Sequence, residues 1–179
     1  MSPILAPVQP ETATGAAKDL LDQVQKTLGL VPEMAKVMAN SPTLLKSYLA
    51  LNGAVATGSI PAAVRERLAI AAAQLNGCEY CLSAHTYIGE NIAKVPADEL
   101  AAARKAQSSD PHVQALLELS NAIASSAGDV PAENIAKARA AGVTDKEIGE
   151  VVANIALNTL TNYFNILAGV ENDWPVVAL

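Results

Sequence analysis

The sequence predicts an all-α protein, built as an array of closely packed helices. Alanine is abundant among the 179 residues, and 51% of the residues are hydrophobic although only 3% are aromatic. Apolar residues recur at helical spacing along the chain, and the alternation typical of half-buried strands is missing. A chain of this length can bury one real core, so we expect a single helical domain over residues 1–179.

Composition also limits the partners that the protein is expected to have. The net charge is −6 and the pI is about 4.8, without a basic run, so nucleic acid and anionic membrane surfaces are not expected partners. No stretch reaches the roughly 18 apolar residues of a spanning helix, and the first residues do not resemble a signal peptide. We therefore expect a soluble, cytoplasmic protein. Because aromatic anchors are few, we expect a second subunit to cover an apolar face, which predicts a homo-oligomer (a dimer, trimer or hexamer).

Start and stop signals divide the chain into short helices. Residues 1–13 are expected to form an extended arm, because prolines recur near the N-terminus and no helical period is present. Serine and proline mark a helix start at Ser41-Pro42, Ser59 with Pro61 repeats this signal, and glycines mark helix ends. The expected helices cover about 14–28, a short segment from 32, and then about 42–57, 61–76, 78–93, 96 onward, 110–124, 131–141 and 145–169.

Both cysteines of the chain and one of its two histidines fall in one motif, Glu-x11-Cys-x2-Cys-x3-His. On a helix, Cys78 and Cys81 are i, i+3 neighbours and His85 follows one turn later, so the three side chains share a face. Glu66 belongs to the preceding helix. A helix break at Gly77 lets the two helices fold back on each other, so that the Glu66 carboxylate can reach the thiols as a base.

The position of the cysteines favours thiol chemistry. Gly77 ends the preceding helix, so the thiols lie in the first turn of a new helix, where free N–H groups and the helix dipole stabilise a thiolate. A thiolate attacks peroxides and disulfides. The dipole argument favours Cys78, the more N-terminal thiol, as the more acidic one, whereas Cys81 has His85 beside it to accept or relay a proton.

This spacing resembles the motif of the AhpD-like family, within the carboxymuconolactone decarboxylase superfamily. The resemblance is close over residues 61–90 and, at the level of the fold, extends over most of the chain. It implies an AhpD-like helical fold and an alkylhydroperoxidase that reduces hydroperoxides through a redox-active disulfide. It also implies the roles of the site residues: Cys81 becomes a sulfenic acid, Cys78 resolves it, and Glu66 with His85 forms the proton relay.

The resemblance implies that no prosthetic group is needed. An external dithiol, such as a thioredoxin-like or lipoyl reductant, would re-reduce the cysteine pair. The chain departs from the family pattern at one position, because the best-known members have histidine just before the second cysteine and this chain has Tyr80. A phenol near neutral pH donates a proton and is not a base, so we assign Tyr80 to the relay or the pocket wall without a basic role.

A shift of 84 positions predicts an internal repeat. It aligns the CxxC-bearing half, about residues 42–94, with a degenerate repeat at about 131–170, and it lays Glu66 on Glu150. Chance similarity between alanine-rich helices is the alternative interpretation.

The predicted repeat lacks the thiols. Cys78 and Cys81 fall on Asn162 and Asn165, so that the segment CEYC corresponds to NYFN. If the repeat is real, only the first copy kept the chemistry. We expect the two asparagines to be satisfied within a helical interface or to line the pocket.

Other functions remain open on the sequence alone. The thiols could be incidental to a carboxymuconolactone decarboxylase-like enzyme, or buried as small hydrophobic side chains. The motif could also belong to a non-catalytic helical oligomer that senses redox state. A zinc site is a further alternative, in which Cys78, Cys81 and His85 supply three ligands and His112 or a carboxylate supplies the fourth.

Several residues also have purely structural interpretations. Glu66 lies between Arg65 and Arg67, so a surface ion pair is the alternative to a catalytic role. His112 stands at a helix start and is assigned no function. Trp174, near the C-terminus, is expected to anchor the tail against this or another subunit.

Overall fold

The structure, a computed structural model, describes residues 4–179. This part of the chain contains α-helices and no strand, which confirms the all-α prediction. None of its helices is both long enough and apolar enough to cross a membrane. The helices are α1 (Gly15–Leu28), α2 (Glu33–Met38), α3 (Pro42–Ala56), α4 (Ala62–Asn76), α5 (Glu79–Asn91), α6 (Ala97–Ala103), α7 (Pro111–Ser125), α8 (Ala132–Ala140) and α9 (Asp145–Ala168).

The helix starts follow the sequence signals with one exception. In α3 the Ser41 hydroxyl accepts the Leu44 N–H at 3.3 Å, as expected of an N-cap. Ser59 is the exception, because it does not cap the helix: α4 begins directly after Pro61, as expected, and has no side-chain cap. Ser59 instead donates its N–H to the carboxylate of Glu150 in α9, at 2.8 Å. This long-range contact could not be read from local sequence.

The N-terminal segment precedes the first helix. No helix occurs before Gly15 in the described residues, and residues 1–3 of the expected arm lie outside them. The arm is attached to the body by backbone hydrogen bonds. The Ile4 N–H donates to the Ala168 carbonyl at 2.9 Å, and the Val8 N–H donates to the Lys36 carbonyl at 3.0 Å.

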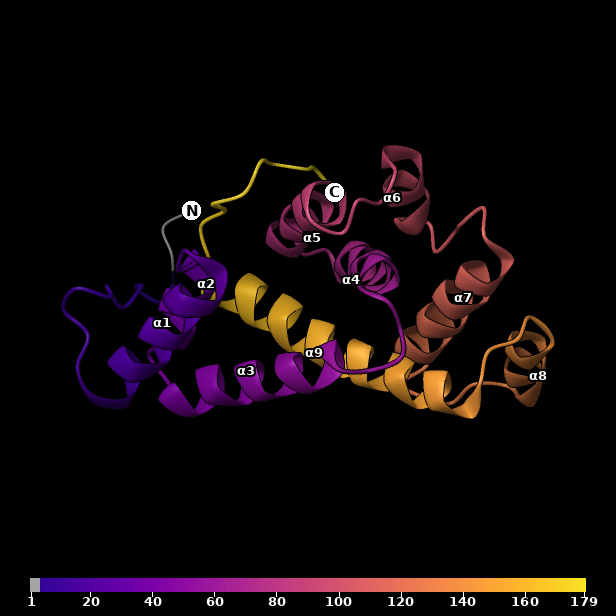
Figure 1. The fold of residues 1–179 in the computed structure, drawn as a ribbon, viewed down its shortest axis with the longest axis horizontal. Helices are drawn as coiled ribbons and strands as arrows, with labels where there is room; N and C mark the ends of the chain where they lie inside the picture. The colour runs from indigo at the N-terminus through magenta and orange to yellow at the C-terminus, as the bar shows by residue number, and fades with distance from the viewer. Residues whose placement is uncertain (1–3) are drawn as a thin grey trace.

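Helix α9 runs through the middle of the molecule and organises the other elements (Figure 1). α3 lies along one side of α9, whereas α4 and α5 lie on the other. α7 and α8 gather at the start of α9, and α1 and α2 gather near its end. The buried apolar residues form three clusters, one among α4, α7, α8 and α9, one among α4, α5 and α6, and one among α1, α2 and α3.

The turn between α4 and α5 positions the cysteines. Gly77 has a φ of 70°, in the left-handed region that favours glycine. The Gly77 N–H bonds the Gln74 carbonyl at 3.3 Å and the Cys78 N–H bonds the Ala73 carbonyl at 2.9 Å, which is the Schellman pattern of a helix end. α5 then packs directly on α4. The break predicted at Gly77 is therefore confirmed.

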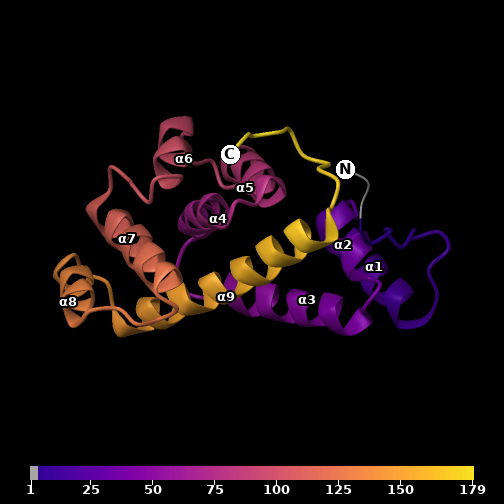
Figure 2. The same ribbon diagram turned by 180° about the vertical axis from the view of Figure 1, so that it is seen from behind.

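The residues after α9 return across the molecule to α5 (Figure 2). The Ser83 hydroxyl accepts from the Asn172 side chain and from the Val177 N–H, each at 3.0 Å. The ring of Trp174 lies 5.5 Å from that of Tyr87, measured between centroids. Trp174 therefore anchors the tail within its own chain, as expected of an aromatic residue with an apolar body.

Candidate functional site

The two cysteines lie at the start of α5, inside the apolar cluster between α4, α5 and α6. Cys78 is the N-cap of α5, and its sulfur accepts the Cys81 N–H at 3.4 Å. Both residues are free thiols, and they are only 1% and 3% exposed. The predicted location at a helix start is confirmed. The sulfurs are also buried, so the chemistry available to them depends on the polar groups that reach them.

A carboxylate and an imidazole are paired beside the thiols. Glu66 Oε2 and His85 Nδ1 lie 2.7 Å apart, and because an ionised carboxylate only accepts, Nδ1–H is the donor. The two side chains are 17% and 25% exposed, so this pair reaches toward solvent where the sulfurs do not. The fold thus brings together all four residues of the motif predicted from the sequence.

The arginines that flank Glu66 bind other groups. Arg65 donates to the Ile60 carbonyl at 2.7 Å. Arg67 forms an ion pair with Glu99 at 2.8 Å, and both of these side chains are largely buried. The surface ion pair considered for Glu66 is therefore absent, and its carboxylate serves His85.

Helix α9 places two buried asparagines against the cysteine pair. Asn165 Nδ2 donates to Cys81 Sγ at 3.1 Å and lies 3.3 Å from Met34 Sδ. Asn162 Oδ1 accepts from Asn76 Nδ2 at 2.9 Å. Cys81 and Asn165, which the shift of 84 positions matched, are thus in direct contact.

The surroundings give the two thiols different acidities. The hydrogen bond from the Cys78 thiol lowers the pKa of Cys81 most strongly, burial opposes it, and the charge of His85 and the amide of Asn165 lower it further, to about 6. The same hydrogen bond, together with burial, raises the pKa of Cys78. The geometry therefore favours Cys81 as the thiolate. The order expected from the helix dipole is reversed, because a direct hydrogen bond outweighs a diffuse dipole.

The pKa of His85 is raised, which favours its charged form. Burial lowers the pKa of the His85 imidazole, but the charge and the hydrogen bond of Glu66, with the charge of Cys81, raise it further than burial lowers it. An imidazolium between a carboxylate and a thiolate can give a proton to a leaving group and recover it afterwards.

Tyr80 is directed toward α2. Its hydroxyl accepts the Met34 N–H at 3.3 Å, and the side chain is 7% exposed. Burial, with the nearby charge of Asp173, raises the pKa of Tyr80. The structure therefore shows a neutral phenol that holds α2 against α5.

Two residues near the thiols were not identified from the sequence. Burial, followed by the negative charges of Cys81 and Glu66, raises the pKa of Tyr48 in α3 to about 12, so its phenol stays neutral. Met34 contacts Asn165 through its sulfur. A tyrosine within the apolar stripe of α3 was an available signal, because buried tyrosines direct their hydroxyl to a polar partner. Met34 offered no signal, because it is remote in sequence.

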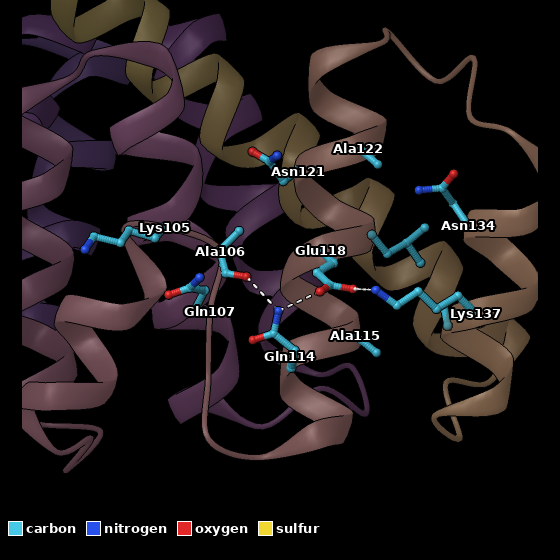
Figure 3. Close-up of a pocket in the computed structure, with 12 residues that line it drawn as sticks. Lys105, Ala106, Gln107, Gln114, Ala115, Glu118, Asn121, Ala122, Asn134 and Lys137 are labelled. Carbon is cyan, nitrogen blue, oxygen red and sulfur yellow. Dashed lines mark hydrogen bonds and ion pairs between the residues drawn. The ribbon is translucent and has the colours of Figure 1, made fainter.

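A polar groove of about 400 Å³ lies away from the thiols, between α7, α8 and the loop that precedes α7 (Figure 3). In this groove Glu118 accepts from Lys137 at 2.6 Å and from Gln114 at 2.8 Å. Its lining contains neither cysteine nor histidine. The groove thus holds polar groups that satisfy one another, and the reactive groups are elsewhere.

The zinc alternative lacks a ligand set. Within residues 4–179, no group of three or more His, Cys, Asp or Glu side chains is arranged to hold a metal ion. His112, the fourth ligand considered, lies at the start of α7, where its Nε2 is 2.8 Å from Glu147 and its Nδ1 is 3.1 Å from the Ala141 carbonyl. His112 therefore stabilises the entry into α9.

Comparison with solved structures identifies similar folds. An uncharacterized peroxidase-related protein from Ralstonia eutropha JMP134, described as an alkylhydroperoxidase AhpD core, is 22% identical with a TM-score of 0.84, and the match covers 96% of this chain and 92% of that one. A peroxidase-related protein from Silicibacter sp. TM1040 is 18% identical with a TM-score of 0.74, covering 96% and 89%. At these levels of sequence identity, the structural matches show that the fold is shared.

A third similar structure is a cysteine-to-alanine variant of the debrominase Bmp8 in complex with 2,3,4-tribromopyrrole. It is 21% identical with a TM-score of 0.79, and the match covers 97% of this chain and 93% of that one. No curated protein matches the sequence.

The sequence itself matches a family model. The model is that of the carboxymuconolactone decarboxylase family, and it matches residues 42–125, the segment that contains both thiols and the Glu66–His85 pair. The structures with the same fold include AhpD-like peroxidase-related proteins. The resemblance found in the motif is confirmed by this match of residues 42–125 to the carboxymuconolactone decarboxylase family, and the fold is that of the AhpD-like proteins.

Proposed function

We propose that this protein is a thiol-dependent peroxidase that reduces hydroperoxides with Cys81 and Cys78. The observation that carries the proposal is the asymmetry of the pair. Cys81 receives a hydrogen bond from Asn165 and has the Glu66–His85 pair nearby, which favours its thiolate, whereas Cys78 keeps its proton. Thiolates of lowered pKa attack peroxides near neutral pH. The peroxidase-related names of two proteins with this fold agree with the proposal.

The proposed reaction moves one oxygen atom and two electrons. The Cys81 thiolate attacks the distal oxygen of the hydroperoxide, so that an S–O bond forms as the O–O bond breaks. The leaving alkoxide takes a proton from His85, whose charged form Glu66 stabilises. The Cys78 thiol then attacks the sulfenic sulfur, an S–S bond forms, and water leaves.

An external dithiol completes the proposed cycle, and no prosthetic group takes part. Cys78 and Cys81 are buried, with 1% and 3% of each residue exposed. A slender reductant, such as a lipoyl arm or a small dithiol, therefore fits this site better than the broad surface of a thioredoxin-like protein. Comparing the rates of disulfide reduction by dihydrolipoamide and by a thioredoxin tests this choice, and a faster reaction with thioredoxin would contradict it.

Thiol counting tests the proposed function. The reduced protein, given one equivalent of hydroperoxide, is expected to lose both thiols and gain a disulfide. Cys81→Ser should lose no thiol, whereas Cys78→Ser should form a sulfenic acid at Cys81 that dimedone traps. An unchanged thiol count in the wild-type protein contradicts the proposal. So does oxidation of Cys78 in the Cys81→Ser variant at the wild-type rate.

Turnover distinguishes the proposal from the other functions considered. A peroxidase consumes many equivalents of hydroperoxide when a dithiol is supplied, whereas a redox sensor is oxidised once and then reacts slowly. A decarboxylase-like enzyme with incidental thiols would keep its activity when Cys78 and Cys81 are both replaced by serine. Loss of all hydroperoxide consumption in that double variant is the result expected here.

A second candidate function is thiol-dependent removal of bromine from an aromatic ring. It is favoured by the shared fold with the debrominase Bmp8, whose cysteine-to-alanine variant was studied with tribromopyrrole. The Cys81 thiolate would take bromine from the carbon, which gains a proton, and the Cys78 thiol would then displace bromide as the disulfide forms. Bromide release from a bromopyrrole, compared with hydroperoxide consumption by the same reduced protein, ranks the two candidates.

We also propose that the protein is a homo-oligomer. One face of α9 carries large apolar residues that are 49–70% exposed in the isolated chain, a patch larger than single scattered residues. Their helical spacing places them on one face. They are Val152, Tyr163, Ile166 and Leu167. Sedimentation should give a multiple of the chain mass, 18.5 kDa, and a monomer at micromolar concentration would contradict the proposal.

A further inference from the structure

Two polar atoms beside Cys81 are buried without a hydrogen-bond partner. They are Nδ2 of Asn162 and Oδ1 of Asn165, whose side chains are 0% and 3% exposed. An unpaired buried polar group costs about 1–3 kcal/mol, so native proteins keep few of them, and a bound or transient ligand is a common reason. One of these atoms is a donor and the other is an acceptor.

The orientation of both amides is fixed by their neighbours. Asn162 Oδ1 accepts from Asn76 Nδ2 at 2.9 Å, so Nδ2 of Asn162 is the atom left free. Asn165 Nδ2 donates to Cys81 Sγ at 3.1 Å. If the Asn165 amide were flipped, its oxygen would face a thiolate that has no proton to give. Its Oδ1 is therefore the free acceptor.

The two amides also lie on the same side of the sulfur site. Asn162 and Asn165 are i, i+3 neighbours on α9 and share a helix face. Asn162 lies close enough to Cys81 to help lower the pKa of the thiol, although it completes no hydrogen bond with the sulfur. A free donor and a free acceptor thus belong to the two amides beside the atom that would gain oxygen in the proposed reaction.

We propose that Asn162 and Asn165 form a binding site for a hydroxyl group on the sulfur of Cys81. That group is the S–O–H of the sulfenic acid and, before the transfer, the distal O–H of the hydroperoxide. Asn162 donates to the oxygen, and Asn165 accepts the hydroxyl proton. One donor with one acceptor complements a hydroxyl, and an apolar ligand would leave both unpaired. This inference rests on the proposed peroxidase function and assigns the part of the site that receives the oxygen.

The amides make and break no covalent bond in this scheme. As the O–O bond breaks, the oxygen that joins Cys81 stays with the two amides, and the alkoxide leaves with the proton of His85. When the Cys78 thiol attacks the sulfur, that oxygen departs as water and the amides are unpaired again. The site therefore stabilises the sulfenic acid for the interval in which the disulfide has not yet formed.

Three matched substitutions on α9 test the inference in the Cys78→Ser background, where the sulfenic acid cannot be resolved. Asn162→Leu and Asn165→Leu each remove one proposed contact. Asn158→Leu is the control, because Asn158 is 4% exposed and its amide donates to the Asn154 carbonyl at 2.9 Å. After an excess of hydroperoxide, which supplies the second equivalent that a sulfinic acid requires, mass spectrometry follows the dimedone-reactive sulfenic acid and the sulfinic acid on the remaining cysteine over time.

We expect Asn162→Leu and Asn165→Leu to shorten the lifetime of the sulfenic acid about tenfold and to increase the sulfinic acid. The Asn158→Leu control should match its parent. Asn165→Leu should also raise the pH midpoint of thiolate absorbance by about one pH unit, and Asn162→Leu should raise it less. Equal behaviour of the three variants overturns the inference. If the Cys78→Ser parent forms no sulfenic acid at all, the proposed peroxidase function fails instead.

A measurement on the folded parent covers the case in which the leucine variants do not fold. In the Cys78→Ser protein, the side-chain amide signal of Asn162 should move downfield when hydroperoxide oxidises Cys81, because the free N–H gains an acceptor. The amide signal of Asn158 should stay in place. An Asn162 signal that does not move on full oxidation overturns the inference.

Discussion

Two regions of the molecule, 84 residues apart in sequence, use the same side chain differently. Glu66 in α4 pairs with His85 at 2.7 Å, beside the thiols. Glu150, the matching residue in α9, accepts the N–H groups of Ser59 and Ile60 at 2.8 and 2.9 Å. One carboxylate therefore holds a proton carrier, and the other clamps the loop that leads into α4. The residues around each carboxylate therefore determine which of these two roles it has.

The helix break explains why only one of these regions holds the thiols at a helix start. The chain turns at Gly77, so Cys78 and Cys81 open a new helix. At the matching position α9 continues through Thr161, whose hydroxyl bonds carbonyls of its own helix. The α9 side chains that match the cysteines thus come from within a continuous helix, and Asn165 contacts Cys81. One region supplies the reactive sulfur atoms, and the other supplies side chains that surround them.

The largest effect is expected from removing the charge of Glu66. Glu66→Gln should slow the oxidation of Cys81 by hydroperoxide about 100-fold, because His85 loses the carboxylate that raises its pKa and is less often protonated when the alkoxide leaves. The pH optimum should move to lower pH for the same reason. Stopped-flow measurement of thiolate loss across the neutral range provides both values.

Glu150→Gln is the matched control for that experiment. It changes the same functional group at the matching position of α9, and its carboxylate contacts only the loop before α4 and the exposed Lys146. The oxidation rate should therefore stay at the wild-type value. If both variants are slowed equally, the carboxylates do not differ in role and the comparison is wrong.

The next effect is on stability, and here the larger change is expected at Glu150. Glu150→Ala should lower the free energy of unfolding by about 2 kcal/mol, because two backbone N–H groups lose a charged acceptor. Gly58→Ala should disturb the same clamp, because a Cβ there would lie 2.8 Å from Glu150 Oε2. The double variant should lose less than the sum of the single losses, since both act on one contact. Urea denaturation measures all three, and strict additivity would contradict a shared clamp.

A smaller effect tests the break itself. Gly77→Ala should cost about 1 kcal/mol, because its φ of 70° strains an L residue while a Cβ there would meet no atom within 4 Å. The thiolate midpoint of Cys81 should rise if the strain is relieved by shifting the start of α5. Thermal unfolding and thiolate absorbance report these two changes separately, and a stable variant with an unchanged midpoint would show that glycine is not required.

Much of the fold was predictable from the sequence because its signals are local. Proline and serine mark the start of α3, and glycine ends α1, α4 and α9. Ser59 misled because the group that binds its N–H comes from Glu150, which a local pattern cannot supply. Where a helix end was fixed by its own residues, the prediction held. Where a distant side chain binds the residue, as Glu150 binds Ser59, the capping role expected from the local pattern was wrong.

The same distinction between local and distant signals applies to the candidate site. The spacing of Glu66, Cys78, Cys81 and His85 was enough to predict that they meet, because all four belong to two consecutive helices. A tyrosine at helical spacing among leucines, such as Tyr48 in α3, is first counted as core, although the charges of Cys81 and Glu66 help to raise its pKa. The acidity order of the thiols also needed the structure, since it depends on the groups that surround each sulfur, among them the Asn165 amide that donates to Cys81 Sγ.

The smallest predicted effect concerns the entry into α9, where His112 bonds Glu147 of the capping box. This bond, then the Ala141 carbonyl, raises the pKa of His112 against the opposing effect of burial, with the charges of Glu147 and Asp110 adding to the rise. A raised pKa means that the folded state binds the proton more tightly than the unfolded state. The resulting stability is fully present below the unfolded pKa, about 6.5, and is lost as the pH rises through the folded pKa.

Substitution of His112 should therefore matter most in acid. The stability difference between the wild-type protein and His112→Gln should be about 0.5 kcal/mol at low pH, since the imidazole is 38% exposed and such pairs are weak. The difference should shrink toward zero in alkali. Urea denaturation on both sides of neutrality measures it, and a difference independent of pH would contradict the assignment. The thiolate midpoint of Cys81 should not change, because His112 supports the start of α9 while the sulfur depends on Asn165 near its end.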